Sequence, residues 1–244
     1  NTPKKGLKSA KRALKLSLTV QDTFLMIKSA NKLAILEKEN SINTTALGTI
    51  IQSLTWAEKI KNDSLIANAQ LVAGHIYSNL KNKKQAINNY KKCLNFYKSV
   101  KDSSGISYTY SGLGIVYYDN HQDSEALSSY LNAERYWVDA ESALKADLWN
   151  NIGALYVDKK EYKNANYYYN KALMHYSTKK WTSEIAMVYD NLAELALFQN
   201  KIADAKDFYN KALLIGKKIN SATEIMWAYQ GLFLTAKKAK KFKQ

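Results

Sequence analysis

Apolar residues recur along this chain with helical spacing, in blocks that short polar turns separate. Within each block the apolar positions follow the i, i+3, i+4, i+7 spacing that places them on one face of an α-helix. Turns of this kind are NKK at 82–84, NHQDS at 120–124 and DKKEY at 158–162. One proline and nine glycines in 244 residues leave few residues that would interrupt helices. The pattern predicts an all-α fold of about 12 helices.

The blocks predict two alternating sets of helices. First helices are expected near 22–38, 63–79, 103–119, 142–158, 182–198 and 222–238. Second helices are expected near 3–19, 43–60, 83–99, 123–138, 162–178 and 202–218. Because the turns between them are short, successive helices are expected to pack as antiparallel hairpins.

The hairpins are copies of one another. Each central copy has a small residue in its first helix, and these residues lie 40, 39 and 40 positions apart: Gly74, Gly114, Gly153 and Ala193. A tyrosine recurs in each second helix with nearly the same shifts: Tyr90, Tyr130, Tyr169 and Tyr209. A small residue in mid-helix is expected where the paired helix crosses closely. Repetition at this period indicates a solenoid of stacked units.

This pattern resembles the tetratricopeptide repeat, whose motif is W-x2-L-G-x2-Y followed by A-x3-F and a later Ala. The final proline of the motif is absent from every copy, and the period is about 40 residues instead of 34. The resemblance implies a right-handed α-solenoid superhelix in which first helices line a concave groove and second helices cover the convex face. We expect one domain over residues 1–244. Its parts are a half-repeat at 1–20, repeats at 22–60, 63–99, 103–138, 142–178 and 182–218, and a terminal helix at 222–238.

A narrower resemblance concerns the asparagines, the longer period and the half-copy NTPKKGLKSAKRAL at the start. These features resemble the sensory repeat regions of bacterial signalling proteins, in which such arrays precede a membrane helix with a histidine kinase or a helix-turn-helix output domain. The resemblance implies a soluble segment of a larger protein in the bacterial periplasm or cytoplasm. Any membrane contact would then be made by a segment outside this chain.

Residues that carry chemistry are scattered along the sequence. The three histidines lie in different copies, without HExxH or Cys/His spacing: His75, His121 and His175. Cys93 occupies a position that holds alanine in other copies, so we expect a small buried residue. Gly112 and Gly114 lie two apart, as in a phosphate-binding loop, but no strand-to-helix turn surrounds them. The sequence predicts no enzyme activity, no cofactor and no metal site.

Charge is distributed unevenly between the two sets of helices. The chain carries +15, yet the four central first helices contain seven acidic residues and one basic residue, so they carry −6 and the remainder carries +21. Nucleic acid bound along the groove would require a basic groove. We therefore expect no nucleic acid there. Binding of nucleic acid or an anionic membrane by a basic convex face stays open as an alternative.

Polar side chains of the first helices are candidates for holding an extended peptide. An asparagine amide can donate to a peptide carbonyl and accept from its N–H. By helical phase, Asn150 and Asn151 precede the buried Ile152, so we expect both to point into the groove. The alternative is an ordinary solvated helix surface. The predicted groove residues are Asn68, His75, Tyr108, Ser111, Asp147, Asn150, Asn151, Asp190, Asn191 and Glu194.

Two functions of different classes are consistent with these observations. The first is a non-catalytic module that binds a protein or peptide in the groove and relays that event to another domain. The second is a free-standing assembly scaffold that docks through its ends. The terminal helix supports the second, with an end-to-end dimer as one form, because it has apolar residues and no partner helix: Trp227, Tyr229, Leu232 and Phe233.

Overall fold

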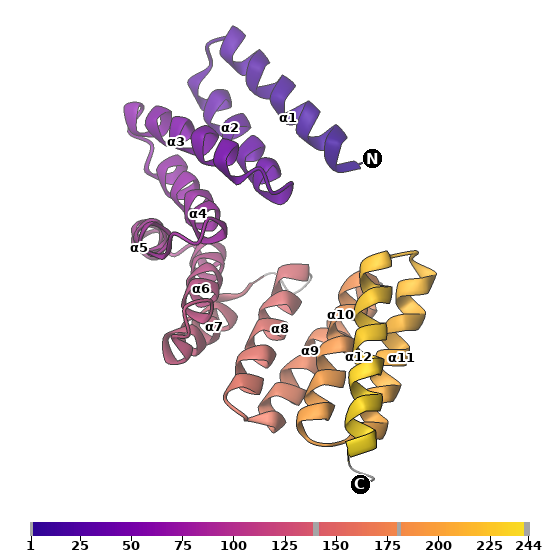
Figure 1. Ribbon diagram of the computed structural model, residues 1–244. Helices are drawn as coiled ribbons and strands as arrows, with labels where there is room; N and C mark the ends of the chain where they lie inside the picture. The colour runs from indigo at the N-terminus through magenta and orange to yellow at the C-terminus, as the bar shows by residue number, and fades with distance from the viewer. Residues whose placement is uncertain (1, 139–141, 180–181, 242–244) are drawn as a thin grey trace. The chain divides into compact units, whose positions relative to one another are not determined.

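The computed structural model describes residues 2–138, 142–179 and 182–241. These residues form helices joined by short turns, without a strand among them. The chain divides into two compact units, residues 1–138 (unit 1) and 139–244 (unit 2). Within each unit, every helix packs against the next helix in the sequence (Figure 1).

The helices confirm the predicted pattern. Unit 1 contains α1 (Thr2–Thr19), α2 (Thr23–Glu39), α3 (Asn43–Lys59), α4 (Asp63–Asn79), α5 (Lys83–Ser99), α6 (Ser103–Tyr118) and α7 (Asp123–Tyr136). Unit 2 contains α8 (Ala143–Asp158), α9 (Tyr162–Lys179), α10 (Thr182–Phe198), α11 (Ile202–Lys218) and α12 (Ala222–Lys241). No predicted end differs from the observed end by more than three residues. The expectation that all the repeats form one continuous domain stays a prediction.

Nine of the turns between helices share one backbone conformation, although none of them uses glycine for it. Nine turn residues adopt a positive φ: Gln21, Ser41, Lys61, Lys81, Lys101, His121, Lys160, Asn200 and Asn220. After α4, the Lys81 N–H donates to the Ser78 carbonyl and the Asn82 N–H to the Tyr77 carbonyl, both at 2.9 Å. These bonds satisfy carbonyls at the helix end. The Asn82 side chain then accepts from the Gln85 N–H and starts α5.

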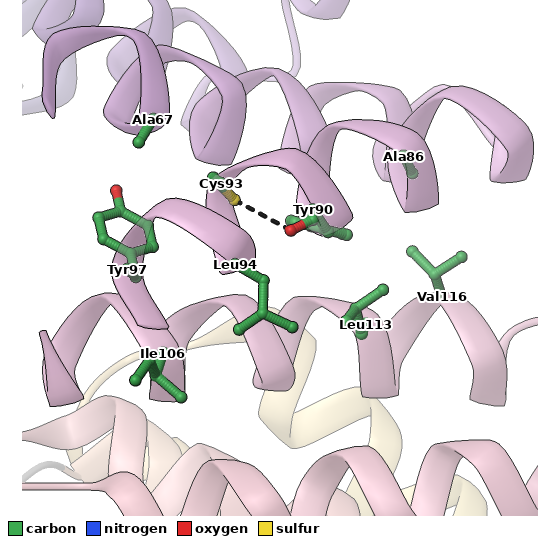
Figure 2. Close-up of a cluster of buried hydrophobic side chains, with 9 residues drawn as sticks. All are labelled: Ala67, Ala86, Tyr90, Cys93, Leu94, Tyr97, Ile106, Leu113 and Val116. Carbon is green, nitrogen blue, oxygen red and sulfur yellow. Dashed lines mark hydrogen bonds between the residues drawn. The ribbon is translucent and has the colours of Figure 1, made fainter. Parts of the chain in front are cut away.

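The core of unit 1 is built around α5, between α4 and α6. Tyr90, Cys93 and Tyr97 of α5 are buried against apolar residues of α6, among them Leu113 (Figure 2). The Cys93 thiol donates to the Tyr90 carbonyl at 3.3 Å, and burial raises the pKa of Cys93 to about 11. The expectation of a small buried residue at Cys93 is confirmed.

The small residues of the first helices make room for the tyrosine rings of the second helices. A Cβ atom added at Gly74 would lie 2.5 Å from the Tyr90 ring, and one at Gly153 would lie 2.6 Å from the Tyr169 ring. Carbon atoms in contact keep about 3.5–4.0 Å. The predicted close crossing is therefore confirmed. The contact is made by an aromatic ring lying on the helix backbone.

Gly112 has the same explanation. A Cβ atom at Gly112 would lie 2.5 Å from the Tyr90 ring, which belongs to the preceding hairpin. Tyr90 thus lies between glycines of α4 and α6. The Gly112–Gly114 pair belongs to helix packing, in the middle of α6.

The buried amide of Asn31 connects helices α2, α3 and α4. The Asn31 side chain of α2 accepts from the Ser53 hydroxyl of α3 at 2.6 Å and donates to the Asn68 Oδ1 of α4 at 2.9 Å. Asn31 and Ser53 are buried, so these bonds replace the water that their polar atoms lose. The pair Asn31–Asn68 holds two successive first helices in register.

Candidate peptide-binding surface

Successive first helices of unit 2 carry corresponding side chains on a face that neighbouring helices leave partly open. We call this face the open stripe. Its members lie on α8, α10 and α12, with i, i+3/i+4 spacing on the last two: Asp147, Asp190, Glu194, Leu197, Gln230, Leu234 and Lys237. The three helices are adjacent in the order α8, α10, α12, since α10 contacts both of the others. The stripe therefore contains three of the predicted groove residues of unit 2, Asp147, Asp190 and Glu194.

The predicted residues of unit 1 are largely engaged in internal contacts. Asn68 is exposed but accepts the bond from Asn31. His75 is half-buried, and its Nδ1 lies 2.8 Å from the Tyr90 hydroxyl. Burial, with a smaller contribution from the charge of Lys38, lowers the pKa of His75 to about 4. At neutral pH this imidazole is uncharged and packs against Tyr90.

The other two predicted residues of unit 1 lie on α6. The Tyr108 ring contacts the Trp137 ring edge to face, with 5.2 Å between the ring centres. Ser111 is half-buried one turn further along the helix. Both side chains are therefore only partly accessible to a ligand.

In unit 2 the asparagines form a bond between helices. The Asn191 amide of α10 donates to the Asn150 Oδ1 of α8 at 2.7 Å. Asn150 is 9% exposed, whereas Asn151 and Asn191 are half-buried. The structure therefore differs from the expectation that Asn150 opens into a groove: this amide is used to hold α8 against α10.

Three members of the open stripe are acidic: Asp147, Asp190 and Glu194. Asp147 accepts a hydrogen bond from the Tyr176 hydroxyl of α9, and burial raises the pKa of Asp147 despite that bond. The charge of Glu184 raises it further. Glu194 is exposed, one helical turn after Asp190. The stripe thus carries three carboxylates, from Asp147, Asp190 and Glu194, and one lysine, Lys237.

Asp190 lies next to a residue that the sequence interpretation missed, Glu224 of α12. Glu224 is 7% exposed, and its Oε1 accepts from the Ser183 hydroxyl at 3.2 Å. Burial, and then the charge of Glu224, raise the pKa of Asp190 to about 7. Glu224 repeats Glu184 with a shift of 40 residues, the period of the array, which is the signal that could have identified it.

A groove of about 440 Å³ lies between α10 and α12 at the end of the open stripe. Its lining is Glu194, Leu197, Phe198, Leu234, Lys237 and Lys238. The Lys238 ammonium donates to the Leu197 carbonyl, which ties the ends of the two helices together. The groove therefore offers apolar walls with an acidic group from one helix and lysines from the other.

The tetratricopeptide-repeat family model matches residues 67–99 and 146–174, which lie in different units. The chain carries tetratricopeptide repeats. A comparison with curated proteins finds no match.

Solved structures share this tetratricopeptide fold along almost the whole chain. BtubC from P. vanneervenii is 17% identical, with a TM-score of 0.75, and the match covers 91% of this chain and 93% of BtubC. A Rap protein complexed with Competence and Sporulation Factor is 13% identical, with a TM-score of 0.70, covering 96% and 70%. A signal-transduction ATPase with a tetratricopeptide repeat sensor, from Pyrococcus horikoshii, is 16% identical, with a TM-score of 0.73, covering 95% and 37%. At identities of 13% to 17%, these matches show that the fold is shared and nothing more.

The last tetratricopeptide helix, α12, exposes large apolar side chains. Trp227, Tyr229 and Phe233 are 46%, 51% and 68% exposed. Leu232 differs from the sequence expectation, because it packs on the buried cluster that includes Leu213 of α11. Leu232 is therefore not part of the exposed apolar face of α12.

Metal-binding clusters and membrane-spanning helices are both absent from the described part of the chain. Within residues 2–138, 142–179 and 182–241, no group of three or more His, Cys, Asp or Glu side chains could hold a metal ion. None of the described helices is both long and apolar enough to cross a membrane.

Proposed function

We propose that this chain binds a peptide or an extended protein segment on the open stripe of its first helices. Tetratricopeptide repeats are typical of protein–protein interaction, and their fold is typically non-catalytic. The observation that carries the proposal is the groove of about 440 Å³ between α10 and α12. Its apolar walls, Leu197, Phe198 and Leu234, suit one or two apolar side chains of a ligand. The polar residues that border it suit contacts to a peptide backbone.

Two structural neighbours support a ligand-sensing role. The Rap protein was solved in complex with Competence and Sporulation Factor, and the Pyrococcus ATPase is described as having a tetratricopeptide repeat sensor. We extend the same role to this chain: occupation of the stripe would be relayed to an output domain of a larger bacterial signalling protein. The predicted groove residues of unit 1, Asn68, His75, Tyr108 and Ser111, stay proposed ligand contacts of that unit.

A change at Leu234 tests the groove. Leu234 is 53% exposed, so Leu234→Asp should leave the fold intact while it places a charge among the apolar walls. The whole chain is immobilised and used to select from a phage-displayed library of random dodecapeptides, and the affinity of recovered peptides is measured by calorimetry. We expect Leu234→Asp to weaken binding at least tenfold, about 1.4 kcal/mol.

Leu214→Asp is the matched control. Leu214 is 70% exposed on α11, outside the open stripe. The control should bind recovered peptides as the unchanged chain does. Equal loss in both variants, or recovery of no peptide above background, would contradict the proposed function.

An assembly scaffold that docks through α12 is the second candidate, and the exposed aromatic face of this helix favours it. In other first helices the position of Phe233 is held by Gly74, Gly114, Gly153 or Ala193. A large residue there prevents the close packing of a further hairpin helix. It suits a different contact, such as a second copy of the chain.

Sedimentation measures this contact. If α12 forms an end-to-end dimer, the mass of the chain should rise with protein concentration, and Phe233→Asp should keep it monomeric at every concentration. Tyr167→Asp, a change at a residue that is 58% exposed on α9, is the control and should leave the dimer intact. A monomer throughout for the unchanged chain would rule out the dimer.

A further inference from the structure

Two lysines of α12 line the groove between α10 and α12, and neither forms an ion pair with a described carboxylate. Lys237 is exposed and Lys238 is half-buried. Both belong to the lining of the groove, together with its apolar walls. The ion pairs found among the described residues involve other lysines: Lys81, Lys159 and Lys211. The groove therefore contains positive charge that no described carboxylate neutralises.

The Lys238 ammonium is held at the wall of this groove. It donates to the carbonyl of Leu197, which lies in the last turn of α10. Carbonyls at the end of a helix carry partial negative charge, so this contact stabilises the ammonium without cancelling its charge. An ammonium has three N–H donors. The Leu197 carbonyl uses one of them, which leaves two for a ligand whose apolar part lies against the same wall.

The two walls of the groove carry opposite charges. Glu194 of α10 lines the groove, yet no ion pair joins it to either lysine among the described residues. The α12 wall has no acidic group of its own, because the sequence from Ile225 to Lys241 contains four lysines and neither aspartate nor glutamate. An anionic group in the groove is repelled by Glu194 and attracted by the lysines. It is therefore directed to the α12 side.

We propose that Lys237 and Lys238 bind a carboxylate of the peptide, while an adjacent apolar side chain of that peptide occupies the groove beside Leu234. The carboxylate belongs to an aspartate or glutamate side chain or to the free carboxyl terminus of the ligand. This inference rests on the proposed function and specifies its ligand. A carboxylate accepts hydrogen bonds at both oxygens, and bonds between ionised partners are the stronger ones.

The apolar walls contribute to the same contact. Leu197, Phe198 and Leu234 line the groove beside the lysines, and Phe198 and Leu234 are 50% and 53% exposed. An apolar side chain of the ligand that covers them excludes water from the groove, which strengthens a charged contact next to it. Both lysines already line the groove, so the contact requires no rearrangement of the helices. An apolar residue next to a carboxylate is thus the feature that the ligand must have.

Peptides selected with the whole chain provide the test. Two dodecapeptide libraries are used, one with the carboxyl end of the peptide joined to the phage coat protein and one with that end free. Each recovered peptide is synthesised as it was displayed and in neutralised forms, with asparagine or glutamine for its acidic residues, or with an amide at a free carboxyl terminus. Loss of affinity in the first form identifies a side chain, and loss in the second identifies the terminus. We expect one of these forms to bind at least tenfold more weakly than the unmodified peptide.

Lys237→Gln removes one charge from an exposed side chain and should weaken the unmodified peptide at least tenfold. The same variant should bind the neutralised peptide as the unchanged chain does, since the contact between the charges is then already absent. Lys218→Gln is the matched control. Lys218 is exposed at the end of α11, before the start of α12, whereas Lys237 lies near the end of that 20-residue helix. The control should bind the unmodified peptide as the unchanged chain does.

An exchange of charges tests the contact directly. Lys237→Glu should bind the unmodified peptide more weakly than Lys237→Gln does, because two carboxylates then repel each other. A peptide with lysine in place of its acidic residue should bind Lys237→Glu at least tenfold more tightly than it binds the unchanged chain. For a peptide that binds through its carboxyl terminus, the form with an amide at that end should lose no affinity in Lys237→Glu.

The outcomes separate the two proposals. Peptides that bind through the groove, as judged by Leu234→Asp, but keep their affinity when neutralised or when Lys237 is replaced, overturn this inference and leave the proposed function standing. Recovery of no peptide from either library overturns both. Equal weakening by Lys237→Gln and Lys218→Gln shows a general charge effect and overturns the specific role of the lysines in the groove.

Discussion

Replacing Gly74 by leucine is expected to lower the free energy of unfolding by about 3 kcal/mol or more, since added groups in a packed core cost 1–3 kcal/mol and occasionally more. The new Cβ atom alone would lie 2.5 Å from the Tyr90 ring. Movement of this ring is restricted, because a Cβ atom at Gly112 would also lie 2.5 Å from it and its hydroxyl is bonded to His75. Urea unfolding followed by circular dichroism measures the change.

The same substitution at Gly48 is the control. Gly48 lies within α3, is exposed, and a Cβ atom there would meet nothing within 4 Å. Gly48→Leu should raise stability by about 0.8 kcal/mol, because leucine is the better helix former. Combining Gly74→Leu with Tyr90→Ala should cost less than the sum of the two single changes. Equal effects at Gly74 and Gly48 would contradict the packing role of Gly74.

The helices and these packing positions could be predicted from sequence because both depend on periodicity. Alternation of apolar and polar residues at helical spacing gives each helix its buried face. A second period, the 39- or 40-residue shift from Gly74 to Gly114 to Gly153, shows that each hairpin repeats the same internal contact. A feature that recurs in every copy is specified several times in the sequence.

The contacts of the candidate surface recur in only one or two copies, and this is why the sequence predicted them incompletely. Helical phase places Asn150 and Asn191 on the same face of their helices, but it does not show that one donates to the other across α8 and α10. Asp190 and Glu224 are 34 residues apart, so their proximity depends on how α10 packs against α12. Phase alone therefore identified Asp190 and missed Glu224.

Both carboxylate oxygens of Asp190 are buried without a hydrogen-bond partner among the described residues, and stability should therefore decrease as pH rises from about 4 to 7. The pKa of Asp190 is raised from 3.8 to about 7, mainly by burial and then by Glu224. Between these values the unfolded chain has released its proton while the folded chain retains it, so each increase in pH favours unfolding. Tyr209, the neighbouring group from α11, stays protonated because its pKa is raised to about 12.

Asp190→Asn should therefore stabilise the protein at pH 8 and leave its stability unchanged at pH 4. A pKa displaced by about three units would correspond to roughly 4 kcal/mol, which partial exposure of Asp190 reduces to about 2 kcal/mol. Urea unfolding of both proteins at the two pH values gives the difference, and the other titrating groups cancel because both proteins contain them. A difference that does not depend on pH would show that folding leaves the pKa of Asp190 unchanged. Asp190 would then have a partner or water at the atoms that the structure leaves without one.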